Sequence, residues 1–227
     1  MKITYLGQAG LLFHINDTLI LVDPYLSDSV AEKDASKRRR IPADERFLKL
    51  RPDIVICTHS HGDHCDRQTL KYFFTQSSEV LALAPRNAWE IMRKFGGDGN
   101  NYICFNAGTE WTENGILFRA VAAEHSDDSA IGVIISASEG NYYITGDTLY
   151  SEKVFASLPE IKMKALFLPV NGRGNNMNFI EAAKFAERIR ADYTVPVHFG
   201  LLDGLDAEQF VCRNRVIPEI YKDIILD

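Results

Sequence analysis

The chain of 227 residues lacks the features that mark several specialised classes of protein. No apolar stretch reaches the ~18 residues needed to cross a bilayer, and no charged and apolar leader follows Met1. Internal repeats, low-complexity segments and linkers are absent as well. The four cysteines are scattered and form no Cys-x-x-Cys pair, which suits a reducing compartment. We therefore expect a cytoplasmic protein with no membrane partner.

An excess of positive charge is also missing. Asp and Glu number 31 against 25 Lys and Arg, which gives a net charge of −6 and an isoelectric point near 5.5. Nucleic-acid-binding proteins normally present a basic surface, so a nucleic-acid partner is not expected. The hydrophobic content of 46% is enough for a substantial core, and we expect one domain over residues 1–227. The oligomeric state stays open.

Apolar β-branched runs alternate with helical patterns along the chain. We expect strands at residues 2–6, 11–15, 18–23, 53–58, 79–84, 101–105, through most of 109–147, and at 164–170 and 192–198. We expect helices near 43–50 and at 66–76, 86–95, 151–157, 178–190 and 206–213, with 24–52 otherwise irregular and 216–226 a strand or an extended arm. Asp66 and Asn178 are placed to cap helices. Periodicity alone predicts only an α/β protein.

Four residues with metal-ligand chemistry lie in one short run, His59-Ser60-His61-Gly62-Asp63-His64. Imidazoles and carboxylates are ligands of zinc and similar ions, and a turn that carries them at positions 1, 3, 5 and 6 can supply two neighbouring ions. A histidine-rich surface loop is the plain alternative. The preceding turn and apolar run at residues 51–58 argue against it, because active sites of α/β proteins lie at the ends of such strands.

Three later motifs carry further ligand-type residues. His125 ends Ala123-Glu124-His125, Asp147 lies in Ile144-Thr145-Gly146-Asp147-Thr148, and His198 lies in Val195-Pro196-Val197-His198-Phe199-Gly200. Each of them comes at or just after the end of a strand-like run, so one edge of the sheets could present them all to a single cleft. The remaining histidine, His14, lies inside an expected strand and receives no role.

These motifs, in this order, resemble those of the metallo-beta-lactamase superfamily. The resemblance implies a four-layer αβ/βα sandwich, in which two mixed β-sheets are flanked by helices. It assigns His59, His61 and His125 to a first ion and Asp63, His64 and His198 to a second, with Asp147 as the bridge. The segments at residues 3–10, 22–28 and 168–173 resemble the branch that contains L-ascorbate 6-phosphate lactonase, although this chain is much shorter than that lactonase.

Two ions bridged by Asp147 and a water would generate hydroxide near neutral pH without a protein nucleophile. Because the ligand set contains no thiolate, zinc is favoured, and manganese or iron would fit the same donors. We therefore predict a dinuclear metal-dependent hydrolase with Asp63 and Asp147 as catalytic carboxylates. The expected substrate is a small anionic metabolite, such as a lactone or a sugar-phosphate-like compound.

Residues outside the ligand set are candidates for substrate binding. Asn171 and Arg173 belong to a glycine-rich loop, and the guanidinium of Arg173 suits a carboxylate or phosphate. The basic run at residues 37–40 could form a lip of the site, with a solvated surface run as the alternative. Asp23 and Asp66 are candidates for orienting the ligating imidazoles, although capping and turn roles explain them almost as well.

Other functions fit the same ligands. The first alternative is a phosphodiesterase or nuclease, which the acidic net charge and the lack of an RNA-binding appendage disfavour. A flavodoxin-linked di-iron reductase is disfavoured because its partner domain is missing and His61 stands where such proteins commonly use a carboxylate. The second alternative is a non-catalytic metal-binding or ligand-sensing module.

Overall fold

The first half of the chain forms a mixed six-stranded sheet. The computed structural model describes residues 1–76 and 79–226. The strands of this sheet, in spatial as well as chain order, are β1 (Lys2–Gly7), β2 (Gly10–Ile15), β3 (Thr18–Val22), β4 (Ile54–Ile56), β5 (Leu81–Ala84) and β6 (Asn101–Cys104). β1 to β3 pair antiparallel, and β3 to β6 pair parallel.

The second half repeats this plan, again with antiparallel strands followed by parallel ones. Its sheet is ordered β12-β11-β10-β9-β8-β7. The strands are β7 (Glu110–Glu113), β8 (Ile116–Ala122), β9 (Ile131–Ala137), β10 (Gly140–Ile144), β11 (Ala165–Pro169) and β12 (Tyr193–Val197). β7 to β10 pair antiparallel, and β10 to β12 pair parallel.

Two tight turns close hairpins of these sheets. Asn16 and Asp17 join β2 to β3, and Asn114 and Gly115 join β7 to β8, all four with positive φ. Two consecutive residues with positive φ form the type of turn whose twist matches that of the flanking strands, and asparagine, aspartate and glycine tolerate this conformation best. Such residue pairs between two apolar runs are a turn signal that can be read from the sequence alone.

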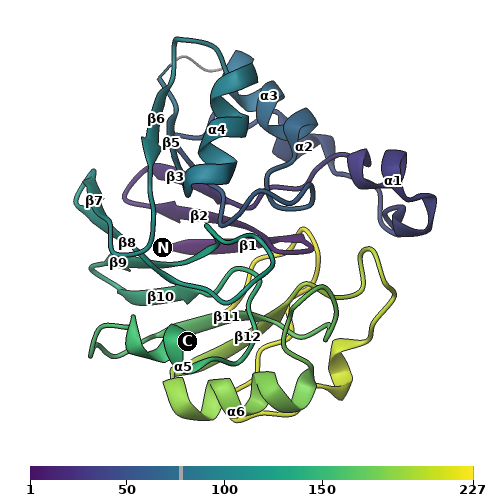
Figure 1. Cartoon of the computed structure of the whole chain (residues 1–227), viewed down its shortest axis with the longest axis vertical. Helices are drawn as coiled ribbons and strands as arrows, with labels where there is room; N and C mark the ends of the chain where they lie inside the picture. The colour runs from purple at the N-terminus through teal and green to yellow at the C-terminus, as the bar shows by residue number, and fades with distance from the viewer. Residues whose placement is uncertain (77–78, 227) are drawn as a thin grey trace.

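The two sheets pack face to face, and helices cover their outer faces (Figure 1). The core between the sheets includes Phe13, Phe118 and Phe167, all fully buried. α3 (Arg67–Gln76) and α4 (Arg86–Phe95) cover the first sheet, and α5 (Glu152–Ala156) and α6 (Phe179–Ile189) cover the second. This arrangement confirms the predicted four-layer αβ/βα sandwich.

The helix ends follow the sequence closely. Asn178 caps α6 by accepting hydrogen bonds from the amides of Ile180 and Glu181, and the Glu181 side chain accepts from the Asn178 amide. At α3, Asp66 accepts from the amides of Gln68 and Thr69. Both predicted caps are therefore confirmed. None of the helices in the described ranges is long and apolar enough to cross a membrane.

Two segments differ from the expectation, and a third takes one of the two forms that were predicted for it. The stretch expected to be mostly irregular contains α1 (Ser29–Lys33) and a 3-10 turn, η1 (Ala35–Lys37), before the predicted short helix α2 (Glu45–Leu48). The helix predicted at 206–213 is only a 3-10 turn, η2 (Ala207–Gln209). Only Ala207 and Phe210 are buried there, and one apolar pair does not make the continuous stripe that stabilises a helix. Residues 216–226 form an extended arm that bonds to β1 without becoming a strand.

Gly146 occupies a tight position directly after β10. Its φ is +60°, and an added Cβ would lie 2.7 Å from the Ile131 carbonyl oxygen and 2.9 Å from the Thr58 Cβ. We expect Gly146→Ala to lower the free energy of unfolding by ~1–2 kcal/mol for the left-handed backbone, and by a further ~1–3 kcal/mol for overpacking.

Gly115→Ala is the matched control, because Gly115 also has a positive φ but an added Cβ there meets nothing within 4 Å. It should show only the backbone effect of ~1–2 kcal/mol. Chemical denaturation of both variants measures the difference. Equal losses in the two variants would show that the contacts around Gly146 are not the constraint.

Candidate metal centre

The loop after β4 carries four of the candidate ligands and is fixed from its two ends by one buried carboxylate. Asp23 accepts hydrogen bonds from the Thr58 amide at 2.7 Å and the Thr58 hydroxyl at 2.6 Å. The same carboxylate contacts Nδ1 of His64 at 2.8 Å. Inside the loop, the amides of His64 and Cys65 donate to the carbonyl of His61, which closes a turn. The turn directs the side chains of the loop toward the second sheet.

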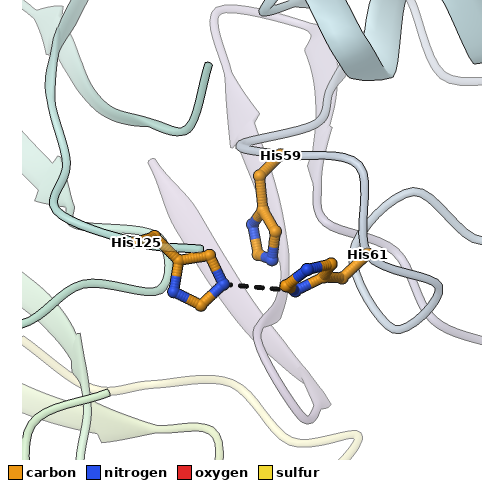
Figure 2. Close-up of side chains that lie close together, drawn as sticks. All are labelled: His59, His61 and His125. Carbon is orange, nitrogen blue, oxygen red and sulfur yellow. Dashed lines mark hydrogen bonds between the residues drawn. The ribbon is translucent and has the colours of Figure 1, made fainter. Parts of the chain in front are cut away.

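A first group of possible ligands consists of His59, His61 and His125. One nitrogen from each ring lies within 4.8 Å of the others. Figure 2 shows the three rings turned toward a common point, with His61 Nδ1 and His125 Nε2 3.1 Å apart. His59 and His61 come from the loop after β4, whereas His125 follows β8 of the other sheet. The group therefore spans the two sheets.

A second group consists of Asp63, His64 and His198, and Asp147 lies between the two groups. His198 Nε2 lies 3.2 Å from Asp63 Oδ2 and 3.2 Å from Asp147 Oδ2. The other oxygen of Asp147, Oδ1, lies 3.2 Å from His64 Nε2. Asp147 also forms a group with His59 and His64. Its carboxylate can therefore reach ligands of both groups, as a bridge requires.

Buried polar atoms without partners show what this site is built to hold. Within the described residues, His59 Nε2, His64 Nε2 and Asp147 Oδ1 are buried without a hydrogen-bond partner, although the last two atoms lie 3.2 Å apart. A buried nitrogen or oxygen without a partner costs about 1–3 kcal/mol. A divalent cation satisfies such lone pairs at once, and imidazole and carboxylate donors suit zinc and its neighbours. The donor set and its geometry fit two divalent cations.

The charges of the second group support the same interpretation. Burial disfavours the charged form of Asp147, but the neighbouring His198 and His64 outweigh it and hold the pKa of Asp147 well below its ordinary value. Burial lowers the pKa of His198, but Asp147 and Asp63 raise it to about 10. The carboxylates therefore stay ionised, and a cation would compete with protons for the imidazole nitrogens.

Contacts behind the rings select which nitrogen faces the site. The carbonyl oxygen of Asn175 lies 3.3 Å from His125 Nδ1, so Nδ1 carries the proton and Nε2 keeps a free lone pair. At His198, Asn171 Nδ2 lies 3.0 Å from Nδ1, while Asn171 Oδ1 is buried without a partner. Turning the Asn171 amide over would let Oδ1 accept a proton from Nδ1, which leaves Nε2 free to bind a metal.

Two further side chains contact the ligands and were not assigned a role from the sequence. Gln8 is buried in the turn between β1 and β2, and its amide donates to Asp63 Oδ2 at 2.8 Å and lies over the His198 ring. The backbone carbonyl of Gln8 accepts a hydrogen bond from the backbone amide of His198. The φ of His198 is 61°, which is unusual for histidine. Asn176 donates to Asp147 Oδ2 at 2.9 Å. The only signal for Gln8 was a polar amide within an apolar run.

The candidate ligands lie at a cleft of about 970 Å³. Its lining includes His61, Asp63, Asp147 and His198 together with several cationic side chains. The cationic residues are Lys33, Lys37, Arg40, Arg67 and Arg173. In the described part of the chain, the side chain of Arg173 has no hydrogen bond or ion pair.

The other residues predicted around the site divide according to their contacts. Within the basic run, Lys37 and Arg40 line the cleft. Arg38 lies 3.8 Å from Asp28, and Arg39 donates to the Tyr25 carbonyl and the Tyr221 hydroxyl. Asp23 contacts His64 as predicted. Asp66 bonds to Ser29 and caps α3 instead of contacting an imidazole, because it lies at the start of that helix.

Known proteins resemble this chain in sequence and in fold. A family model described as a beta-lactamase superfamily domain matches residues 2–198. A UPF0173 metal-dependent hydrolase of Methanopyrus kandleri is 29% identical over 242 aligned residues, which cover 99% of this chain and 94% of the relative. A UPF0173 metal-dependent hydrolase of Aeropyrum pernix is 29% identical over 228 residues, which cover 93% of this chain and 88% of the relative.

Solved structures are similar over the whole chain. A possible metal-dependent hydrolase from Veillonella parvula has a TM-score of 0.80 at 17% identity, covering 99% of this chain and 98% of that one. An isothiocyanate hydrolase from Delia radicum gut bacteria has a TM-score of 0.77 at 19% identity, covering 100% of each chain. At such low sequence identities, the structural similarity shows the fold alone. The family match shows that this chain belongs to the beta-lactamase superfamily.

Cation binding should displace protons from the second group. His198 is protonated below its pKa of about 10, and only the neutral ring binds a metal. The affinity for zinc should therefore rise with pH through the neutral range, by about tenfold per pH unit for each proton displaced. Calorimetric titration of the chelator-treated protein, in buffers of different ionisation enthalpy, measures the protons released.

His14→Gln is the control for this titration, because His14 is exposed on β2 and belongs to neither ligand group. It should release the same number of protons as the wild type. A zinc affinity that is independent of pH, with no proton release, would contradict the predicted competition at His198.

Proposed function

We propose that this chain is a dinuclear metal-dependent hydrolase of small anionic molecules, with a lactone or a sugar-phosphate-like compound as the first candidate. The observation that carries the proposal is the set of unpartnered ligand atoms between the two groups, beside an open cleft. Such atoms need a cation, and the cleft gives a substrate access to it. The names of the Methanopyrus and Aeropyrum relatives, both metal-dependent hydrolases, support this reaction class.

The anionic character of the substrate follows from the charge around the cleft. The whole chain carries a net charge of −6, yet five cationic side chains line this one cleft, against four carboxylates of which two belong to the candidate ligands Asp63 and Asp147. Arg173 presents a planar guanidinium there, and none of the carboxylates in the described part of the chain pairs with it. A guanidinium of this kind binds carboxylate and phosphate through paired hydrogen bonds. We therefore assign Arg173 to substrate binding and Lys37 and Arg40 to electrostatic attraction.

The proposed mechanism divides the work among the residues of the site. Two bound cations would lower the pKa of a water molecule toward neutrality and polarise the oxygen of the group under attack. The ionised carboxylates of Asp63 and Asp147 would hold the two metal sites together and accept a hydrogen bond from the attacking water. Gln8 and Asn176 keep these carboxylates in place through their amide groups. Asn171, predicted to bind substrate, orients His198.

We propose zinc as the native metal, because all donors in the two groups are imidazoles or carboxylates in a geometry without thiolates. Manganese and iron accept the same donors and are the alternatives to test. A cytoplasmic location stays a prediction from the cysteine pattern.

A mixed panel of substrates tests the reaction class. The metal-loaded protein is incubated with lactones, esters, phosphodiesters and an isothiocyanate, and product release is measured with and without chelator. Chelator-sensitive release from an anionic lactone or ester supports the proposal. Preference for phosphodiesters would favour the nuclease alternative, and zinc binding without turnover on any member would favour a sensing module.

Asp147 should matter for both cations. Its carboxylate lies 4.0 Å from His125 Nε2 of the first group and 3.2 Å from His198 Nε2 of the second, so Asp147→Ala should weaken both binding steps by at least about tenfold. His125→Ala should weaken mainly one step, because His125 belongs to the first group alone. Elemental analysis and competition with a chromophoric chelator measure the stoichiometry and the two affinities. Two tightly held cations in Asp147→Ala would rule out a bridging role.

Arg173 should discriminate between charged and neutral substrates. A charge-assisted hydrogen bond contributes about 1.5–3 kcal/mol, so Arg173→Ala should lower kcat/KM for an anionic substrate by about tenfold to a hundredfold. A neutral analogue should be hydrolysed almost as before. Arg213→Ala is the control, because Arg213 is exposed and lies away from this cleft. Equal losses on both substrates would assign Arg173 a structural role.

Lys37 and Arg40 should act differently. Removing both charges should reduce the salt dependence of kcat/KM more than its value at high salt, since exposed charges are screened within about 8 Å at physiological ionic strength. The measurement is kcat/KM for the anionic substrate over a range of salt concentrations. An unchanged salt dependence would exclude them from substrate capture.

A further inference from the structure

Asp127 is a buried carboxylate that joins three separate segments beside the first ligand group. Its Oδ2 accepts a hydrogen bond of 2.8 Å from the amide of Ser60. Its Oδ1 accepts from Asn87 Nδ2 at 2.7 Å and from the amide and hydroxyl of Ser129 at 2.9 and 2.8 Å. The side chain of Asp127 is thus shared by the ligand loop, by helix α4 and by its own loop between β8 and β9.

The hydrogen bonds of Asp127 link the two loops that carry the first ligand group. Ser60 lies between His59 and His61, and Asp127 lies two residues after His125. The loop after β4 belongs to the first sheet, and the loop after β8 belongs to the second. One carboxylate therefore ties the loop that carries two ligands to the loop that carries the third. The Ile131 amide also donates to the Thr58 carbonyl near this point, and Asn87 of α4 donates to Ser129 and Asp128, but neither Ile131 nor Asn87 bonds to the segment between His59 and His61.

We propose that Asp127 is a positioning residue that sets the separation between His125 and the pair His59 and His61. The inference rests on the proposed function, because it takes these three histidines as ligands of one cation. Three imidazole nitrogens can share a cation only within a narrow range of distances. Hydrogen bonds behind the ligands commonly fix such distances, and their loss weakens metal affinity by about tenfold to a hundredfold.

The effect should be confined to one cation. The second group is fixed by other contacts, since Asp23 holds His64 and Gln8 holds Asp63. Neither of these side chains bonds to Asp127. A general loosening of the fold would weaken both cations, whereas a change in the spacing of the first group would weaken one.

Asp127→Asn is the first variant to test. It keeps the size of the side chain but replaces one carboxylate oxygen with an NH2 group. When the remaining oxygen accepts from Asn87 and Ser129, the NH2 group faces the Ser60 amide and cannot accept a hydrogen bond from it. The matched control is Asp128→Asn, because Asp128 is exposed, also accepts from Asn87 Nδ2, at 3.0 Å, and does not contact the ligand loop. Both variants leave every proposed ligand in place.

Zinc affinities are measured by competition with a chromophoric chelator, and cobalt absorption spectra report the geometry of each site. His125→Ala and His198→Ala assign the two affinities and the two sets of bands. We expect Asp127→Asn to weaken the step lost in His125→Ala by at least about tenfold and to change its cobalt bands. The other step should change by less than about twofold, and Asp128→Asn should match the wild type.

Each outcome decides the matter. Unchanged affinities in Asp127→Asn, or equal losses at both steps, overturn the positioning role. If the wild type itself binds no stoichiometric cation, the proposed function fails instead. Should Asp127→Asn not fold, as judged by circular dichroism, Asn87→Ala combined with Ser129→Ala removes the two side-chain donors to Oδ1 and keeps Asp127 with the backbone amide of residue 129. That variant should weaken the same step, and an unchanged affinity there also overturns the inference.

Discussion

The site depends on a buried carboxylate at the end of the third strand. Asp23 is fully buried, and it bonds to Thr58 before the ligand loop and to His64 at its end. Buried charges are costly unless they are fully hydrogen-bonded, and Asp23 meets this requirement only when the loop has its observed shape. The fold and the site are therefore coupled: β3 and β4 must pair in register before the ligands can converge.

The same principle governs the ligand groups themselves. Five histidines and two aspartates lie close together beside the cleft, most of them partly or fully buried, and the aspartates and protonated histidines carry charges of opposite sign. Without cations this cluster is held by protons on His64 and His198, whose pKa values Asp147 raises against the effect of burial. The protein thus presents ligand atoms in nearly final positions, and the packing of the two sheets sets their spacing.

Sequence patterns predicted the parts of this structure that have a local cause. The loop ligands were recognisable because their spacing is set within six residues, and His125, Asp147 and His198 because each follows an apolar run. Turn residues such as Asn16 and Asp17 and the cap at Asn178 also act on their own neighbours. The four layers came from the resemblance to a known superfamily, since periodicity alone indicated no more than an α/β protein.

What the sequence did not reveal depends on contacts between distant segments. Gln8 meets Asp63 across 55 positions of chain, and Asp127 meets Ser60 across 67. No local pattern distinguishes such an amide or carboxylate from one on the surface. A helix was predicted at residues 206–213, where only the short turn at Ala207–Gln209 forms. The reason is related, because the neighbours of a segment decide how much apolar surface it buries.

The extended arm at the end of the described chain has a consequence for the order of folding. Tyr221 and Ile224 bond to the backbone of β1, and the Tyr221 hydroxyl contacts Arg39 and Pro42. β1 is therefore covered by a segment that is synthesised long after it. Until these residues emerge, one edge of the first sheet is open and the segment that leads to Arg40 lacks its support. During synthesis, the cleft can only take its final form after this segment has left the ribosome.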